Sequence, residues 1–180
     1  MLAAGCEAGA PTPPRSGGTP GTPQSGIDPA VDRSAAIYSA VVERLVREDH
    51  TFGRGESPFE HVYVIDGPVP RAGNPIQSFT SEPEEPFPDD LKAAIEAELR
   101  DLPPVDFVSD RESVLREKPG RVINRGVIVS LGPIAPSGNR VRVANNLWCG
   151  ALCGQWLTYV VERHADRWRV AGTVGPYAIS

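Results

Sequence analysis

Apolar side chains recur at every third or fourth position in two segments of the chain, which is the spacing of an amphipathic helix. The first segment opens with Asp28-Pro29, an N-cap residue followed by a proline at the first helical position, and its apolar residues are Ile37, Tyr38, Val41, Val42, Leu45 and Val46. The second opens with Pro88-Asp89-Asp90, is stopped by Pro103-Pro104, and carries the apolar residues Leu91, Ile95, Leu99 and Leu102. We expect helices over about 29–49 and from Pro88 to Leu102, with both apolar faces in the core.

The remaining apolar segments are short or alternate with a period of two, which predicts β-strands. Two short strands are expected at His61–Ile65 and Val105–Val108, and four longer ones at 121–131, 140–149, 155–163 and 167–174. The connections between the last four are of hairpin length, which predicts an antiparallel meander. The expected fold class is therefore α+β: two helices packed on a mainly antiparallel sheet that ends in a C-terminal four-strand meander.

The alternation along 140–149 assigns side chains to the two faces of this sheet. One face carries Val141, Val143, Leu147 and Cys149, and the other carries Arg140, Arg142, Asn146 and Trp148. We expect the first face to pack on the helices and the second to be partly solvated. The proline-rich segment 66–88 is predicted to be a long exposed loop, either functional or a flexible insertion.

The first six residues end in Ala4-Gly5-Cys6 and resemble a bacterial lipobox, in which the cysteine receives a diacylglyceryl group. Residues 7–27 contain 15 Gly, Pro, Ser or Thr residues and a single large apolar one, a composition typical of a disordered spacer. The Leu2–Cys6 motif with this spacer resembles uncharacterised actinobacterial lipoproteins. The resemblance implies a truncated signal peptide (1–6), a spacer (7–27), one α+β domain (28–180) and lipidation of Cys6. The alternative is a cytosolic protein with a flexible N-terminus.

Composition narrows the function classes only modestly. The net charge is −5 and no basic stripe is visible along the chain, which argues against binding of nucleic acid. No apolar run reaches the length of a membrane-spanning helix. The expected partners are the membrane, through the lipid on Cys6, and an unknown protein or small-molecule ligand.

The other two cysteines, Cys149 and Cys153, flank Gly150-Ala151-Leu152. If these three residues form a hairpin loop, the cysteines face each other and a disulfide is possible, which an oxidising compartment favours. The alternative is two small buried thiols.

The sequence contains no recognisable catalytic or cofactor-binding motif. It contains no nucleophile elbow, phosphate-binding loop or zinc-protease motif, and His50, His61 and His164 are scattered. No catalytic residue, cofactor or metal site is therefore predicted. A pocket is possible near the 150–153 turn, lined by Trp148, Trp156, Tyr159, Asn146 and Gln155, although the same residues suit a packed core.

The C-terminal segment 154–170, with its hydrophobic strand, acidic turn and Arg167-Trp168-Arg169-Val170, resembles the closing hairpin of cone-shaped domains such as nuclear transport factor and the polyketide cyclases. Three functions follow as hypotheses. The first is a membrane-anchored extracytoplasmic lipoprotein that acts as a non-enzymatic binding or structural module of the envelope. The second is a cone-type small-molecule-binding protein or enzyme. The third is an inhibitor or immunity-like protein that acts through the 66–88 loop, which an ordered loop with exposed Phe79 and Phe87 would favour.

Overall fold

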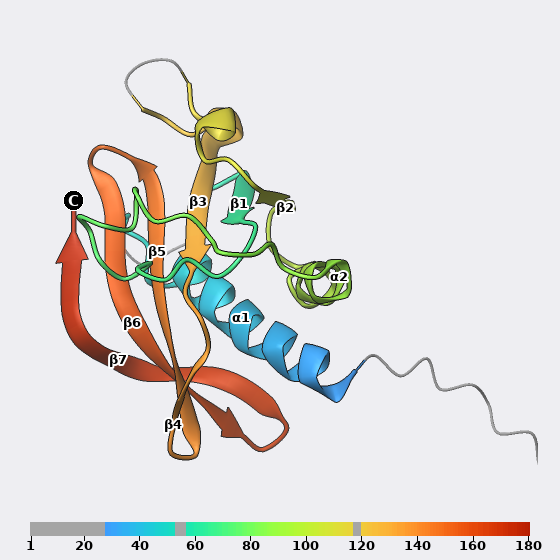
Figure 1. The fold of residues 1–180 in the computed structure, drawn as a ribbon. Helices are drawn as coiled ribbons and strands as arrows, with labels where there is room; N and C mark the ends of the chain where they lie inside the picture. Colours follow the sequence, from blue (N-terminus) through green and yellow to red (C-terminus); the bar gives the residue numbers. More distant parts are fainter. Residues whose placement is uncertain (1–27, 53–56, 117–119) are drawn as a thin grey trace, which may run out of the picture.

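Two helices cover one face of a seven-stranded sheet in the computed structural model, which describes residues 28–52, 57–116 and 120–180 (Figure 1). The helices are α1 (Pro29–Arg47) and α2 (Asp89–Glu98), and short 3-10 turns lie at Glu112–Val114 and Ile123–Arg125. The strands are β1 (His61–Ile65), β2 (Val105–Val108), β3 (Gly126–Leu131), β4 (Ala135–Ser137), β5 (Arg140–Gly150), β6 (Cys153–His164) and β7 (Arg167–Ile179). The α+β class and the C-terminal strand series are confirmed.

The strand order is β2-β1-β3-β5-β6-β7, with β4 paired to β5 alone. Strand β1 pairs in parallel with β2 and β3, while β3, β5, β6 and β7 are antiparallel neighbours in chain order. The predicted four-strand meander is therefore correct, and helix α2 provides the crossover between the parallel strands β1 and β2.

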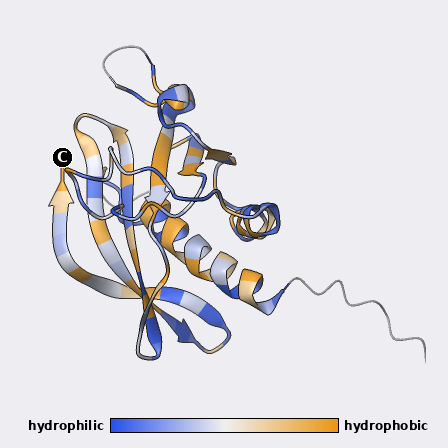
Figure 2. Cartoon of the chain, in the orientation of Figure 1, coloured by the Kyte–Doolittle hydropathy of each residue, from blue (hydrophilic) through white to orange (hydrophobic). Residues whose placement is uncertain are grey.

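Helix α1 begins as the sequence predicts, because Oδ1 of Asp28 accepts a hydrogen bond of 2.8 Å from the amide N–H of Ala30. Its apolar stripe is buried against the sheet, with Ile37, Val41 and Leu45 fully covered. Figure 2 shows the matching arrangement, with the apolar colours concentrated along α1 and the strands it crosses. Burial of this stripe, more than intrinsic helix propensity, stabilises α1.

Several strand ends differ from the prediction. Strand β3 begins at Gly126 and not at residue 121, because Asn124 and Arg125 adopt left-handed conformations with φ of 54° and 48° that end the extended run. Strand β7 continues to Ile179, past Gly175-Pro176. A proline is tolerated there because β7 is the edge strand, where one row of N–H groups has no ladder partner. The segment expected as a loop before β5 includes the short strand β4.

The segment 66–88 is a loop without helix or strand, as expected, but part of it is packed, which corrects the expectation that the whole loop is exposed. It lies against the sheet face opposite the helices, where Val69, Ala72 and Ser78 are fully buried. Phe87 is also buried, at 3% exposure, and contacts the rings of Tyr38 and Phe107. The second sheet face is therefore covered near the centre of the sheet and exposed elsewhere. The exposed pair of phenylalanines that would favour an inhibitor-like role is not found, since Phe87 is in the core.

Candidate functional site

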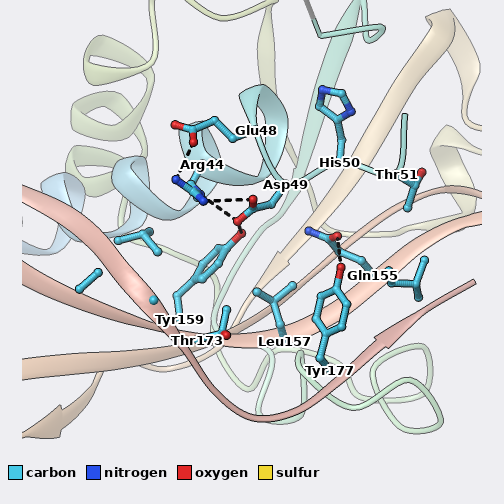
Figure 3. A pocket seen from close by; sticks show the side chains of 14 residues that line it. Arg44, Glu48, Asp49, His50, Thr51, Gln155, Leu157, Tyr159, Thr173 and Tyr177 are labelled. Atoms are coloured by element: carbon cyan, nitrogen blue, oxygen red, sulfur yellow. Dashed lines mark hydrogen bonds and ion pairs between the residues drawn. The ribbon is translucent and has the colours of Figure 1, made fainter. Parts of the chain in front are cut away.

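A pocket of about 830 Å³ lies between the C-terminal end of α1 and the strands β6 and β7 (Figure 3). The helix end and the residues after it contribute Arg44, Glu48, Asp49, His50 and Thr51, and β6 contributes Gln155, Leu157 and Tyr159. Strand β7 closes the other side with residues 170–173, Tyr177 and Ile179. The pocket thus joins a polar wall from the helix to a largely apolar wall from the sheet.

The curvature of β7 creates this space. The pairing register of β6 with β7 shifts twice, between Trp156 and Thr158 and between Val160 and Val161. Such bulges bend a strand and increase its twist. Gly175 adds a left-handed position at φ 76°, and β7 curls around the end of α1 in Figure 1. The sheet is therefore concave where it faces the helix end.

The end of α1 folds so that Asp49 lies beside Arg44. The carbonyl oxygen of Arg44 accepts hydrogen bonds from the amides of both Glu48 and Asp49, each 3.0 Å long, which turns the chain back as it leaves the helix. The Arg44 guanidinium then binds both carboxylate oxygens of Asp49, with Nε 2.8 Å from Oδ2 and Nη2 3.2 Å from Oδ1. This two-point geometry fixes the orientation of both side chains.

Tyr159 completes the cluster from β6. Its hydroxyl donates a hydrogen bond of 2.8 Å to Oδ2 of Asp49 (Figure 3). Burial raises the pKa of Tyr159 above its usual range, and the neighbouring Asp49 carboxylate raises it further. The hydrogen bond to Asp49 raises the pKa of Arg44. A neutral phenol, a carboxylate and a guanidinium are therefore held together as a fixed polar wall.

Three buried polar atoms in the pocket lining have no hydrogen-bond partner among the described residues. They are Nε2 of Gln155, Nε2 of His50 and Oγ1 of Thr51, and only two other buried side-chain atoms of the described part share this state. Gln155 is 2% exposed, and its Oε1 accepts a hydrogen bond of 3.3 Å from the Tyr177 hydroxyl. Among the described residues, the unmet hydrogen-bonding capacity is thus concentrated in this pocket, where each such group costs roughly 1–3 kcal/mol when left unpaired.

The three groups differ in orientation. The Gln155 amide lies between Tyr177 and the end of α1, with its nitrogen directed toward the helix end in Figure 3. The His50 ring points away from Gln155 and packs near Phe52 and Phe59, with ring centroids 6.1 and 6.0 Å away. Gln155 is consequently the central polar group of the pocket, and His50 belongs to its periphery.

The five residues predicted to line one pocket lie on two faces of the sheet. Gln155 and Tyr159 line the pocket beside α1. Asn146, Trp148 and Trp156 point to the opposite face, because neighbouring residues along a strand alternate. A single pocket that contains all five is therefore wrong.

The opposite face holds a packed aromatic cluster. The Trp156 indole N–H donates a hydrogen bond of 2.7 Å to Oγ of Ser78, and Phe79 makes edge-to-face contacts with Trp148 and Trp156, both at 5.8 Å. Asn146 donates a 3.0 Å hydrogen bond to the Ala72 carbonyl. These side chains anchor the 66–88 segment to the sheet, which is a packing role.

Cys149 and Cys153 form a disulfide, with their Cα atoms 5.3 Å apart. The loop differs from the predicted three-residue hairpin, because Gly150 pairs with Cys153 and only Ala151-Leu152 form the turn. Cys149 lies at a register shift between Trp148 and Gly150. That irregularity places the two cysteine side chains diagonally across the hairpin, within reach of each other.

The other predicted features are dispersed or lie outside the described residues. His61 binds Asp106 at 2.7 Å, and His164 ends β6. Within residues 28–52, 57–116 and 120–180 no group of three or more His, Cys, Asp or Glu residues could hold a metal ion. Neither α1 nor α2 combines the length and apolar character that a membrane crossing requires. Cys6 and the spacer 7–27 lie outside the described residues.

Sequence reasoning missed the helix-end half of the pocket. Arg44, Asp49, His50 and Thr51 lie within or just after the predicted first helix, and the sequence analysis assigns none of them to a site. A signal was present in the polar run from Arg47 to Thr51 that directly follows the apolar stripe. The run alone does not reveal that β6 and β7 close over it.

Comparisons with known proteins found no matching family, no similar curated protein and no similar solved structure.

Proposed function

We propose that this protein is a non-enzymatic binding protein that holds a small molecule in the pocket between α1 and the strands β6 and β7. The observation that carries the proposal is the side chain of Gln155, which is 2% exposed, lines the pocket and has an amide nitrogen without a partner. A buried amide with one end bound and the other free is well suited to orient a ligand.

The free groups define the chemistry of the ligand. Because Oε1 of Gln155 accepts from Tyr177, its free Nε2 is a donor. Nδ1 of His50 accepts a 3.3 Å hydrogen bond from the Phe52 amide, which leaves Nε2 as the donor nitrogen of this ring. A matching ligand presents acceptor oxygens to these groups.

The charge and the apolar surface of the pocket lining narrow the chemical class of the ligand further. The lining contains two carboxylates, Asp49 and Glu48, against the single guanidinium of Arg44, which disfavours an anionic ligand. Leu157, Ile179 and other β-strand side chains provide apolar contact. The favoured ligand is therefore uncharged and partly apolar, with a carbonyl-type oxygen.

Binding is favoured over catalysis by the way the titratable groups are used. Both oxygens of Asp49 are occupied by Arg44 and Tyr159. Tyr159 keeps its proton because burial raises its pKa. The cluster thus fixes the pocket wall and leaves neither group free to exchange protons with a substrate.

The proposed setting is the outer face of a cell membrane. It rests on the sequence alone: the lipobox-like Leu2–Cys6 motif and the Gly/Pro-rich spacer 7–27 that follows it. Two acyl chains on Cys6 give a stable anchor without help from the domain.

Matched probes test the pocket. Acetophenone carries a carbonyl acceptor on an apolar ring, and ethylbenzene has a similar shape without the acceptor. We expect acetophenone, more than ethylbenzene, to shift the NMR signals of the Gln155 side-chain amide. Gln155→Met should weaken acetophenone binding about fivefold, the value of one hydrogen bond, while Gln77→Met, outside the pocket, should leave it unchanged. Equal binding of both probes, or no effect of Gln155→Met, would contradict the proposal.

A further inference from the structure

Four arginines come together on one face at the end of the sheet farthest from the disulfide. Arg140 and Arg142 lie on β5, and Arg167 and Arg169 lie on β7. All four are exposed. The sequence shows no basic stripe, because the two pairs are separated by a strand and a turn. These four arginines are called the basic face below.

The strand register shows that they share a surface. Glu162 of β6 pairs with Arg140 on one side and with Arg169 on the other. Arg167 pairs with His164, two residues further along β6. Paired residues on adjacent strands point to the same side of a sheet, so all four guanidinium groups leave from one side. Figure 2 shows the two hairpin tips at this end in hydrophilic colours.

Little negative charge opposes the basic face. Glu162 is bound to Arg140, with Oε2 2.8 Å from Nε. Asp166, in the β6–β7 turn, lies 3.9 Å from Arg163, whose side chain leaves from the other side of the sheet. Four arginines against Glu162 leave an excess of positive charge on a protein whose net charge is −5. This concentration is consistent with an interaction surface.

The basic face lies beside the start of the folded chain. Trp168, between Arg167 and Arg169, points to the opposite side of β7, where the guanidinium carbon of Arg33 lies 5.2 Å from its ring centre. The N-terminal part of α1 therefore lies against the helix-covered side of the same end of the sheet, directly behind the basic face. A lipid on Cys6 would hold this end of the domain closest to the membrane, since Cys6 precedes Asp28, the first described residue, by only 22 residues.

We infer that the basic face rests on a surface of anionic phospholipid headgroups. Guanidinium groups bind phosphate oxygens at two points, and four of them spread over neighbouring strands suit an array of headgroups better than a single ion. Each basic residue near an anionic bilayer strengthens binding about fivefold. The position beside the attachment point of the tether favours a membrane over a nucleic acid. The inference is independent of the pocket and of its ligand.

The test uses the full chain produced without lipidation, so that an acyl anchor contributes nothing. The protein is sedimented with vesicles of phosphatidylcholine alone or mixed with phosphatidylglycerol, at low and at high salt. Arg140→Gln/Arg142→Gln/Arg167→Gln/Arg169→Gln removes the basic face. The matched control removes four exposed arginines elsewhere: Arg100→Gln/Arg116→Gln/Arg121→Gln/Arg125→Gln.

We expect salt-sensitive binding of the wild type and of the control variant to the mixed vesicles, and a loss of more than about tenfold for the basic-face variant. Circular dichroism and acetophenone binding check that each variant is folded. Absence of wild-type binding, an equal loss in both variants, or tighter binding to a DNA duplex than to the mixed vesicles would overturn the inference. Failure here with an intact acetophenone site would leave the proposed function standing.

Discussion

The hydroxyl of Tyr159 donates a 2.8 Å hydrogen bond to Oδ2 of Asp49, a residue 110 positions earlier in the chain. This contact joins the end of α1 to the middle of β6. It sets one wall of the pocket and ties the helix to the sheet at the point where β7 bends away. The same contact is both a stabilising interaction and the element that positions the candidate site.

Replacing Tyr159 by phenylalanine tests this contact. Tyr159→Phe should lower the free energy of unfolding by roughly 2 kcal/mol, because the bond goes to a charged acceptor in a buried setting. The matched variant is Tyr38→Phe, which removes a longer bond of 3.3 Å to the neutral Gly132 carbonyl and should cost about half as much. Urea unfolding near neutral pH measures both. Equal losses of unfolding free energy in the two variants would mean that the hydrogen bond to Asp49 stabilises the protein no more than the one to Gly132.

The fold could be predicted from the sequence because its elements are encoded locally. The three-to-four spacing from Ile37 to Val46 and the two-residue alternation after position 120 each reflect the face that an element buries. Hairpin-length connections then determine the neighbours in the meander. The errors lie at Asn124 and at Gly175-Pro176, where a left-handed turn and the tolerance of an edge strand for proline depend on tertiary context.

The candidate site could be predicted only in part, since it is made by contacts between distant segments. Gln155 and Tyr159 were named because polar and aromatic residues cluster near the 150–153 turn. Trp156 was grouped with them by proximity in sequence, although alternation along β6 places it on the other face. The partner of Tyr159 is Asp49, and no local pattern links a helix end to a strand that follows more than a hundred residues later.

The close packing of the 66–88 segment predicts a clear difference between two glycines. A Cβ on Gly73 would lie 2.8 Å from the Leu157 carbonyl oxygen, whereas a Cβ on Gly172 would meet nothing within 4 Å. Gly73→Ala should therefore destabilise the protein by roughly 1–3 kcal/mol, and Gly172→Ala should change its stability by less than about 0.5 kcal/mol. Thermal unfolding compares them. A neutral Gly73→Ala variant would indicate that the segment is not held against the sheet.

The proposed lipidation of Cys6 predicts membrane attachment that depends on the sulfur of this one residue. Expressed with a complete signal peptide in a host that processes lipoproteins, the protein should partition into the detergent phase, and Cys6→Ser should move it to the aqueous phase. The matched control is the pair Cys149→Ser/Cys153→Ser, which should stay in the detergent phase. A Cys6→Ser protein that remains with detergent would show that the lipobox interpretation is wrong.

The hairpin disulfide predicts a defined redox state and a modest stabilisation. Protein exported to an oxidising compartment should resist alkylation at Cys149 and Cys153 until it is reduced, as intact mass can show. Because the bond closes a loop with a sequence separation of only 4, reduction should cost roughly 2 kcal/mol of stability. Two cysteines that are alkylated without reductant in the exported, denatured protein would show that the bond does not form.

Alkaline pH should destabilise the protein through its buried tyrosines. Burial raises the pKa of Tyr38 to about 12, above the value of about 10 in an unfolded chain. The folded state therefore holds this proton more tightly, so the stabilisation is complete below pH 10 and is lost as the pH rises through about 12. Over that interval the free energy of unfolding should fall by roughly 3 kcal/mol from Tyr38 alone.

Tyr38→Phe removes this contribution, while the other groups still titrate. The stability of this variant, measured by urea unfolding between about pH 9 and pH 12, should therefore decline less steeply than that of the wild type. Identical slopes for the two proteins would mean that Tyr38 ionises as easily in the folded state as in the unfolded chain.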